Sequence, residues 1–330
     1  MIGLPSTGSV GSVGANLLDK ALEVTVAGSF TSVGFAARSK TQHWGPLTDM
    51  TGVRVVITGP TSGLGRATAE RLASLNADLV LVGRSADRTE ATAHDLARRG
   101  DGHVQVVIAD MSELGEVATA SAAVRKAGPV DVLIHNAGAL LADYTTTSDG
   151  FEVTYACHVL GPFRMTHDLL PSFRQSGRSR VLTMTSGGMY SERLDAQKVQ
   201  MAADDYDGVV AYARAKRAQV VLTEQWARRY PGVAVFHAVH PGWADTPGVA
   251  SSLPRFHSIV GPLLRTPEQG SDTICWLTNA AEAEAINGKL WLDRRVRQTS
   301  KVPWTITGQA QAEALWDRVS RDTGTGTPTS

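Results

Sequence analysis

The 330-residue chain carries 32 basic and 32 acidic residues and has no formal net charge. Balanced charge provides no field that would attract nucleic acid, so we expect a small-molecule partner and no nucleic acid. The chain is long enough for two average domains or one large α/β domain. Its two cysteines, Cys157 and Cys275, are too few for a disulfide framework and lack zinc-site spacing. We therefore expect no metal site and a cytoplasmic location.

Residues 1–50 differ in composition from the rest and form an N-terminal extension. Its first part is rich in Gly and Ser, which is typical of flexible chain, and has no basic region like that of a signal peptide. Residues 17–38 are mostly apolar, but Asp19, Lys20 and Glu23 interrupt them and leave the segment short for a membrane-spanning helix. We interpret it as a docked amphipathic helix. A peripheral membrane contact is the alternative, although basic residues do not cluster along one face.

Short apolar segments alternate with helical ones through the rest of the chain. The predicted strands are residues 53–58, 77–83, 103–110, 130–135, 180–185 and 233–239. Continuous apolar strands separated by helices predict a parallel sheet covered on both faces, with right-handed crossovers. We therefore predict an α/β fold, with one doubly wound Rossmann-fold domain and a parallel seven-stranded sheet over residues 51–321. Residues 322–330 are polar and are expected to be a disordered tail.

A glycine-rich loop, TGPTSGLG, follows the first predicted strand. Glycines let a backbone approach a pyrophosphate, which the N-terminus of the next helix stabilises through free N–H groups. The spacing departs from G-x-G-x-x-G and lacks the lysine of a P-loop, so a turn without a ligand is the alternative. Its position favours dinucleotide binding by Gly59, Thr61, Ser62, Gly63, Leu64 and Gly65.

The end of the second predicted strand bears on the choice of cofactor. A carboxylate at this point would bind the adenosine ribose of NAD, but Gly83 occupies it. Arg84 follows, with Arg88 nearby, and a guanidinium can bind a 2′-phosphate through paired hydrogen bonds. This favours NADP(H) as cofactor. A solvent-facing arginine with no ligand is the alternative.

Tyr212 and Lys216 stand four residues apart near the start of a predicted helix. Residues at this spacing share a helix face, so the phenol and the ammonium can point into the same space. Taken alone, the pair equally fits a lysine stem packed along an aromatic ring.

Several motifs together resemble those of the short-chain dehydrogenase/reductase family. They are T-G-x-x-x-G-x-G from Thr58 to Gly65, HNAG at 135–138, Ser186, and the Y-x-x-x-K of Tyr212 and Lys216. The resemblance covers residues 51–292 and implies hydride transfer between a nicotinamide and a carbonyl or secondary alcohol. Within the family, the segments LEVTVAGSFTSVGF, YDGVVAYARAKRAQVVLTEQWA and HPGWADTPGV are similar to the dehydrogenase/reductase family member 12 subgroup.

The resemblance implies roles for four catalytic residues. Tyr212 would be the general acid/base, and Lys216 would lower the pKa of its phenol and hold the nicotinamide ribose. Ser186, favoured over Thr185, would bind the substrate oxygen. His158 stands where relatives have Asn. It preserves that role if a backbone carbonyl and a water suffice, and weakens the proton relay if the amide is required.

The resemblance also implies further contacts to the cofactor. Asp110 and Met111 would lie at the adenine, and the HNAG motif, in which His135 replaces a common Asn, would support the sheet beside the cofactor. A Pro-Gly turn with a helix cap at Asp245 or Thr246 is compatible with contacts along the nicotinamide. The full set is Asp110, Met111, Asn136, Ala137, Gly138, Tyr212, Lys216, Pro241, Gly242 and Thr246.

The long connection from Ser186 to Tyr212 predicts a lid or a wall beside the active site. Met189, Tyr190, Trp243 and residues 249–264 either line an apolar pocket or are plain packing. The expected function is reduction of an apolar ketone or aldehyde. The alternatives are a catalytically weak NADP(H)-binding sensor or scaffold, and a membrane-associated reductase. The resemblance also implies a homodimer or homotetramer through the helix of Tyr212 and its neighbour.

Overall fold

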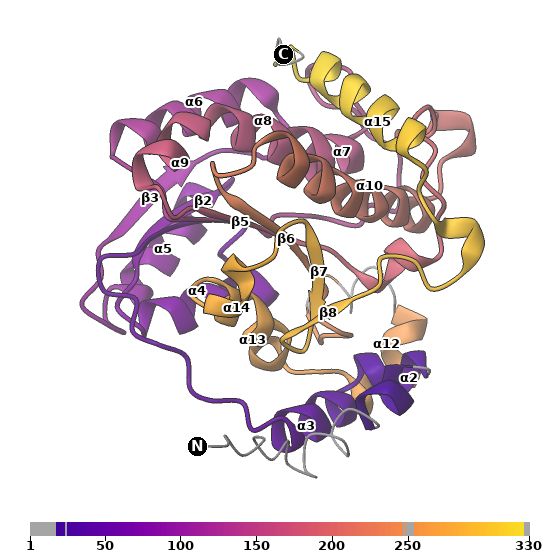
Figure 1. Cartoon of the computed structure of the whole chain (residues 1–330). Helices are drawn as coiled ribbons and strands as arrows, with labels where there is room; N and C mark the ends of the chain where they lie inside the picture. Colours follow the sequence, from indigo (N-terminus) through magenta and orange to yellow (C-terminus); the bar gives the residue numbers. More distant parts are fainter. Residues whose placement is uncertain (1–17, 24, 247, 249–253, 327–330) are drawn as a thin grey trace, which may run out of the picture.

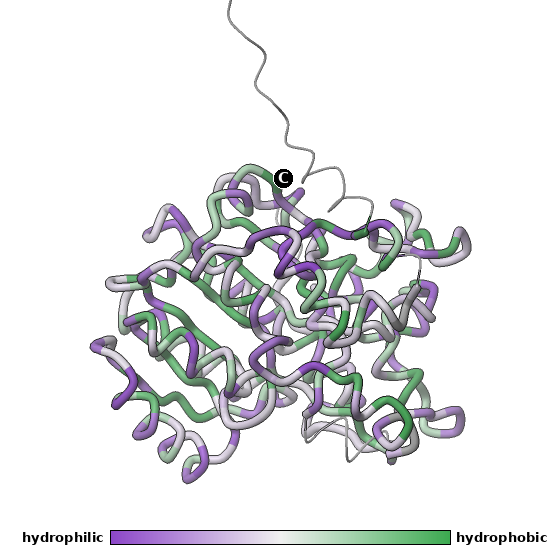
Figure 2. The backbone as a smooth tube through the Cα atoms, turned by 90° about the horizontal axis from the view of Figure 1, so that it is seen from below, coloured by the Kyte–Doolittle hydropathy of each residue, from purple (hydrophilic) through white to green (hydrophobic). Residues whose placement is uncertain are grey.

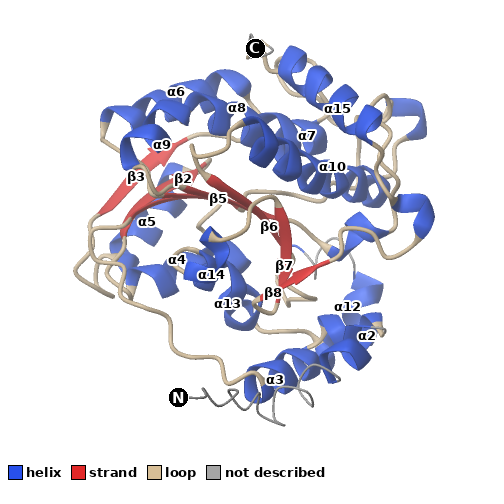
Figure 3. Ribbon diagram, in the orientation of Figure 1, coloured by secondary structure: helices blue, strands red, loops and turns tan. Residues whose placement is uncertain are grey.

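One eight-stranded sheet lies between two layers of helices in the computed structural model, which describes residues 18–23, 25–246, 248 and 254–326 (Figures 1 and 3). The strand order is β3-β2-β1-β4-β5-β6-β7-β8. The strands are β1 (Arg54–Thr58), β2 (Asp78–Gly83), β3 (Val104–Ile108), β4 (Val132–His135), β5 (Arg180–Met184), β6 (Val235–Val239), β7 (Lys289–Leu292) and β8 (Arg295–Arg297). The α/β Rossmann fold predicted from the sequence is confirmed.

The sheet is parallel from β3 to β7 and ends in one antiparallel strand. In β8, Val296 pairs with Trp291 of β7 in antiparallel register. Asp293 and Arg294 both have a φ of 54°, so the chain reverses in a tight turn that matches the twist of the two strands. The prediction of seven parallel strands therefore missed this short edge strand, because the turn carries neither Gly nor Asn.

Helices cover both faces of the sheet because its central strands are apolar on both sides (Figures 1 and 2). One layer contains α4 (Gly63–Ala73), α5 (Ala86–Leu96), α13 (Pro267–Leu277) and α14 (Ala281–Glu284). The other contains α6 (Leu114–Lys126), α7 (Val153–Tyr155), the π-helix η1 (Ala156–Leu160), α8 (Gly161–Asp168), α9 (Leu170–Ser176), α10 (Gly208–Arg229) and α15 (Gln309–Asp322). Short helices in connections are η2 (Gly187–Tyr190), η3 (Ala203–Asp205), α12 (Pro254–Val260), η4 (Gly261–Leu263) and η5 (Pro303–Thr305).

The N-terminal extension forms short helices near α12 rather than one continuous helix (Figure 1). Residues 18–23 are helical, followed by α2 (Val26–Phe30) and α3 (Ser32–Thr41), and the extended backbone of Thr31 separates the last two. The extension packs on the domain, since the guanidinium of Arg38 is buried and binds the carboxylate of Asp293. Its Gly- and Ser-rich start lies outside the described residues. Among those described, none of the helices combines the length and the apolar character that crossing a bilayer requires.

The C-terminal helix α15 packs against α10 and α8. The ring of Trp316 lies 4.8 Å from Trp226 and 4.9 Å from Phe163, and all three are buried. Beyond α15, the hydroxyl of Thr323 still donates to the carbonyl of Val319. The end of the predicted tail, residues 327–330, lies outside the described part of the chain.

Candidate active site

The glycine loop connects β1 to α4 at the carboxyl edge of the sheet. Gly59 and Gly63 have φ values of 67° and 52°, a region that side chains with a Cβ rarely adopt. A Cβ on Gly59 would also lie 2.8 Å from the Cα of Ala137. Thr61 and Ser62 complete the turn. The loop therefore has the bare backbone at a helix N-terminus that a pyrophosphate requires, with Leu64 and Gly65 in the first turn of α4.

The motif after β4 fixes this loop. The side-chain amide of Asn136 donates to the carbonyls of Thr58 and Gly59, both at 3.1 Å. The backbone N–H groups of Asn136 and Ala137 both donate to the hydroxyl of Thr58 at 3.0 Å. The structure thus brings the predicted 58–65 and 136–138 segments into one hydrogen-bonded unit. His135 is buried beneath them, 2.8 Å from the hydroxyl of Thr166.

Arg84 and Asp110 meet beyond the ends of β2 and β3. The guanidinium of Arg84 is 77% exposed and lies 3.9 Å from the carboxylate of Asp110. One oxygen of Asp110 is fixed by the N–H and hydroxyl of Ser112, at 2.9 and 2.7 Å. Met111 is buried, and its carbonyl lies against Gly161. An exposed guanidinium at this edge has the chemistry to bind a phosphate group.

Ser186, Tyr212 and Lys216 converge between β5 and the first turns of α10. Asp207 caps this helix by accepting from the N–H groups of Val209 and Val210. The hydroxyl of Ser186 is near enough to the phenol of Tyr212 to lower the pKa of the phenol. The ammonium of Lys216 lies 5.3 Å from the centre of the Tyr212 ring. The side chains of these three predicted catalytic residues therefore lie together at one point of the carboxyl edge.

Two neighbouring groups fix these side chains. The ammonium of Lys216 donates to the carbonyl of Met184 at 2.8 Å. The hydroxyl of Thr185 donates to the backbone carbonyl of Lys216 at 3.1 Å and is buried. Thr185 therefore ties β5 to α10, which leaves Ser186 as the hydroxyl facing Tyr212.

Burial dominates the electrostatics of the pair. It raises the pKa of the Tyr212 phenol, and the nearby hydroxyl of Ser186 opposes the increase. Burial also lowers the pKa of Lys216 to about 7. The expected lowering of the Tyr212 pKa by Lys216 is therefore not the dominant effect in this structure. The physical reason is geometric, since the ammonium lies over the ring and donates to Met184.

His158 lies in the π-helix η1, one turn before α8. Its Nε2 is 2.8 Å from the carbonyl oxygen of Ala139, and its ring meets that of Tyr212 edge-on at 5.2 Å. Burial, with a smaller contribution from the charge of Lys216, lowers the pKa of His158 to about 3. The imidazole is therefore neutral at physiological pH. A Cβ on Gly138 would overlap this ring, so the HNAG glycine makes room for it.

The backbone carbonyl of His158 is engaged as well. The side-chain amide of Gln219, one turn after Lys216, donates to it at 2.8 Å. The sequence pattern does not single out Gln219, because Arg217, Thr223 and Gln225 are polar residues buried on the same helix.

The loop after β6 contains the predicted nicotinamide contacts. Gly242 has a φ of 78° and donates its N–H to Nδ1 of His240 at 2.8 Å, directly after buried Pro241. Trp243 donates its N–H to the carbonyl of Phe30 at 2.7 Å. Thr246 is half-buried at the end of the loop. Contact with the N-terminal extension was not predicted, because no local pattern relates residues so far apart.

Of the residues considered for an apolar pocket, Met189 belongs to the core, whereas Ile259 and Leu263 of the segment 249–264 are 79% and 45% exposed. Met189 is fully buried in a cluster with Val220, Ala238 and Leu290. The hydroxyl of Tyr190 donates to the carbonyl of Gln298 at 3.0 Å. Of the segment 249–264, residues 249–253 lie outside the described part of the chain.

The short chain dehydrogenase family profile matches residues 53–255, which is more than half of the chain. The chain belongs to the short-chain dehydrogenase/reductase family. It is 36% identical over 259 residues to bovine dehydrogenase/reductase SDR family member 12, covering 78% of this chain and 81% of that protein. It is 29% identical to human retinol dehydrogenase 13, covering 84% and 86%. A crystal structure of an uncharacterised protein from Mycobacterium paratuberculosis has a TM-score of 0.69 and 26% identity, covering 86% and 97%.

Membership of this family makes the protein an oxidoreductase that acts on CH–OH or C=O groups with a nicotinamide cofactor. The residues at the carboxyl edge fit such a cofactor. The N-cap residue Ser62 makes no side-chain capping bond to the N–H groups at the start of α4, and a Cβ on Gly59 would lie 2.8 Å from the Cα of Ala137. At the other end, the Pro241–Gly242 turn and the Tyr212–Lys216 pair face the same edge of the sheet.

Proposed function

We propose that the protein is an NADP(H)-dependent reductase of an apolar ketone or aldehyde. The observation that carries this proposal is the grouping of Ser186 and Lys216 around Tyr212: Ser186 lowers the pKa of the phenol, and the Lys216 ammonium lies 5.3 Å from the centre of the same ring. A module that only bound the dinucleotide would not need a hydroxyl pair at this position. The bound nicotinamide would supply or accept a hydride at the substrate carbon.

The residues of the chain supply the proton and the orientation. Ser186 donates a hydrogen bond to the substrate oxygen and fixes it beside Tyr212. The phenol of Tyr212 is protonated at neutral pH, since the ordinary pKa of tyrosine is about 10 and burial raises it further, so it can donate its proton to the oxygen as negative charge develops there. Lys216, with its pKa lowered to about 7, can return a proton to the phenolate. In the oxidative direction the same atoms move the proton in reverse.

The preference for NADP(H) rests on Arg84. Gly83 ends β2 without a side chain, and the guanidinium of Arg84 is largely exposed beside it. A 2′-phosphate can bind this guanidinium through two charge-assisted hydrogen bonds, whereas a ribose hydroxyl would lack a carboxylate partner here. We infer that Asp110 accepts from the adenine amino group, since Ser112 already fixes its carboxylate.

An apolar substrate agrees with the name of human retinol dehydrogenase 13, one of the relatives. The catalytically weak sensor or scaffold is the alternative, and His158 is the observation that favours it. The contacts of His158 speak against that alternative, since Gln219 donates a hydrogen bond to its backbone carbonyl and its ring packs against Tyr212. We therefore propose that His158 supports the catalytic set as a neutral residue.

A peripheral membrane contact of residues 17–38 and a cytoplasmic location remain proposals.

The burial of α10 restricts which surface the proposed homodimer or homotetramer can use. Every residue from Ala215 to Thr223 is buried within one copy of the chain, partly beneath α15. A partner subunit would therefore have to bind elsewhere on α10 or on another surface. Light scattering coupled to gel filtration measures the assembly directly.

The function is tested by NADPH oxidation with a panel of aldehydes, ketosteroids, quinones and retinoid carbonyls. Tyr212→Phe is the matched variant because it removes the hydroxyl and keeps the ring against His158. We expect turnover with at least one apolar carbonyl, and its loss in Tyr212→Phe with NADPH binding retained. Tight NADPH binding without turnover by either protein would favour the sensor. Turnover that survives in Tyr212→Phe would contradict the proposed mechanism.

A further inference from the structure

Two buried arginines join the N-terminal extension to the body of the protein. Arg38 and Arg265 are each 1% exposed, and both bind the carboxylate of Asp293, at 2.7 and 2.6 Å. Asp293 lies in the turn between β7 and β8 and is itself fully buried. Burial alone would raise its pKa, but the charges and hydrogen bonds of Arg265 and Arg38 outweigh burial and lower it. The cluster is therefore ionised at neutral pH.

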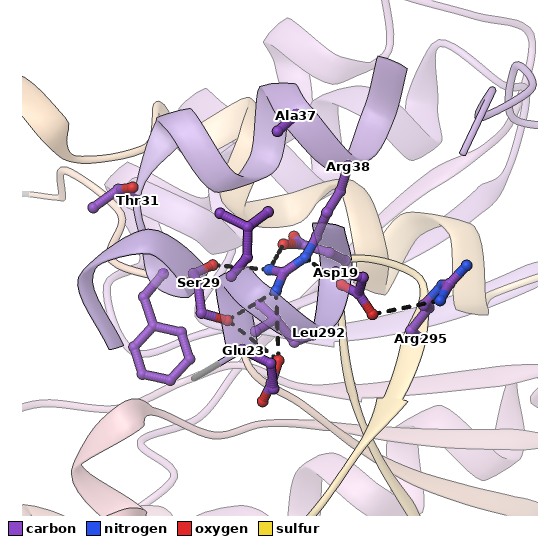
Figure 4. Close-up of polar contacts among 12 residues, drawn as sticks. Asp19, Glu23, Ser29, Thr31, Ala37, Arg38, Leu292 and Arg295 are labelled. Atoms are coloured by element: carbon purple, nitrogen blue, oxygen red, sulfur yellow. Dashed lines mark hydrogen bonds and ion pairs between the residues drawn. The ribbon is translucent and has the colours of Figure 1, made fainter. Parts of the chain in front are cut away.

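Arg38 also binds earlier residues of the extension. Figure 4 shows its guanidinium surrounded by Asp19, Glu23 and Ser29. The bond to Asp19 is 2.7 Å, and the bond to the carbonyl of Ser29 is 3.0 Å. Arg38 thus connects all three helical pieces of the extension to one another and to Asp293.

The break between α2 and α3 presents carbonyl groups to the other arginine. Because Thr31 is extended, the carbonyls at the end of α2 need partners from outside the helix. Arg265 donates to the carbonyl of Ser29 at 2.9 Å and to that of Phe30 at 3.0 Å. The carbonyl of Phe30 also accepts the N–H of Trp243 at 2.7 Å.

Arg265 in turn sets the shape of residues 240–246, which we call the nicotinamide loop. Its side chain donates to the carbonyl of Pro241 at 3.3 Å. Its backbone pairs with the loop on both sides, donating to Trp243 at 2.7 Å and accepting from Asp245 at 2.8 Å. A Cβ on Gly242 would overlap the guanidinium. The loop therefore turns around the side chain of Arg265 and packs against it.

The ring of Phe30 supports the same loop from behind. It stacks on His240 with the ring centres 4.3 Å apart, and the ring of Trp243 meets it edge-on at 5.8 Å. His240 accepts a hydrogen bond from the N–H of Gly242. The stacked ring of Phe30 therefore supports the Pro-Gly turn through His240. Phe30 is only 2% exposed.

We propose that the N-terminal segment 18–41 is a positioning element of the active site, which holds the nicotinamide loop in its binding conformation through Arg38, Phe30 and Arg265. The assignment of this loop to the nicotinamide rests on the proposed function. The segment acts through the loop and does not itself touch the reacting atoms. Its removal would therefore weaken binding of the nicotinamide half of the cofactor and spare the adenosine half.

The first test measures the loop without any ligand. Hydrogen exchange is followed in residues 240–246 of the full chain, in the wild type, Arg38→Met and Phe30→Ala. Arg180→Met is the matched control, because Arg180 is also buried but bonds the carbonyls of Leu277 and Ala280 at the amino end of β5. We expect exchange in the loop to accelerate about tenfold or more in Arg38→Met and Phe30→Ala, with β5 unchanged. Unchanged exchange of the loop in both variants would overturn the proposal.

The second test compares NADPH with 2′-phospho-ADP-ribose, which lacks the nicotinamide. We expect Arg38→Met and Phe30→Ala to weaken NADPH binding about tenfold while the affinity for 2′-phospho-ADP-ribose changes less than about twofold. Equal weakening of both ligands would contradict a role in positioning the nicotinamide side. Phe30→Ala leaves the ion cluster intact, so it decides the question if Arg38→Met does not fold. If the wild type binds neither ligand, the proposed function is wrong, and the exchange measurement still decides whether the segment holds the loop.

Discussion

The side-chain amide of Gln219 donates a 2.8 Å hydrogen bond to the backbone carbonyl of His158. This bond crosses from α10 to the π-helix η1, where an irregular turn leaves carbonyls free of the regular helical pattern. It also places Gln219, one turn after Lys216, in contact with His158. The position of the His158 ring against Tyr212 therefore depends on a partner outside the recognised motifs.

Gln219→Leu should lower both stability and turnover. Losing the donor leaves a buried carbonyl without this partner, which costs about 1–3 kcal/mol of unfolding free energy. Displacement of the His158 ring should lower kcat about tenfold. Gln225→Leu is the control, because Gln225 is equally buried on α10 but bonds Arg229. Denaturant unfolding and steady-state kinetics measure the two effects, and equal kcat values in both variants would refute a role for Gln219 at the site.

His158→Asn should leave the shape of the pH–rate profile unchanged. The pKa of His158 is lowered to about 3, so its imidazole is neutral in the native state from about pH 5 to about pH 9. No step in this range can then depend on its protonation. The profile of kcat/KM against pH measures this directly, and loss of an ionisation near pH 6 to 7 in the variant would show that His158 titrates during turnover.

Arg84→Ala should weaken NADPH binding much more than NADH binding. The lost interaction is a charge-assisted contact to the 2′-phosphate, so we expect about a tenfold or larger rise in the Kd for NADPH. Arg178→Ala is the control, because Arg178 is also largely exposed but lies at the amino end of β5. Fluorescence titration with each dinucleotide provides the measurement. Equal losses for NADPH and NADH would exclude Arg84 as the phosphate ligand.

Acid should destabilise the protein through its buried histidines. Burial lowers the pKa values of His135, His158 and His240 to about 3 and that of His237 to about 4. Between these values and the unfolded value of about 6.5, the unfolded state binds more protons, so stability falls as the pH falls below about 6.5. Calorimetry at pH 5 in buffers of different ionisation enthalpy should show proton uptake on unfolding approaching one per buried histidine. Proton uptake no larger than at pH 8 would contradict the prediction.

Trp316→Ala should destabilise the whole domain. Its ring packs between Trp226 and Phe163, and removing a large buried side chain costs about 3–5 kcal/mol. Trp304→Ala is the control, because the Trp304 side chain is 67% exposed and should cost little. Thermal unfolding measures both. A Trp316→Ala variant as stable as the wild type would show that α15 is not part of the domain.

The local order of the fold could be read from the sequence because each element carries its own signal. Apolar strands, the glycine loop and the Tyr212–Lys216 spacing are all short-range patterns, and parallel strands place their following loops at one edge of the sheet. In the structure, Ser186, Tyr212 and Lys216 lie together, and Asn136 is hydrogen-bonded to the glycine loop.

Only the tertiary structure decided which buried residues contact those motifs. Arg38, Asp293 and Arg265 are separated by up to 255 residues, and no periodicity relates them, yet burial without water forces these charges to pair. The same holds for Phe30 on His240 and for Gln219 on His158. Pairing of this kind depends on which surfaces the fold brings together and encloses. The sequence predicted the candidate catalytic groups and their edge of the sheet, and the enclosed contacts around them decided their protonation and their support.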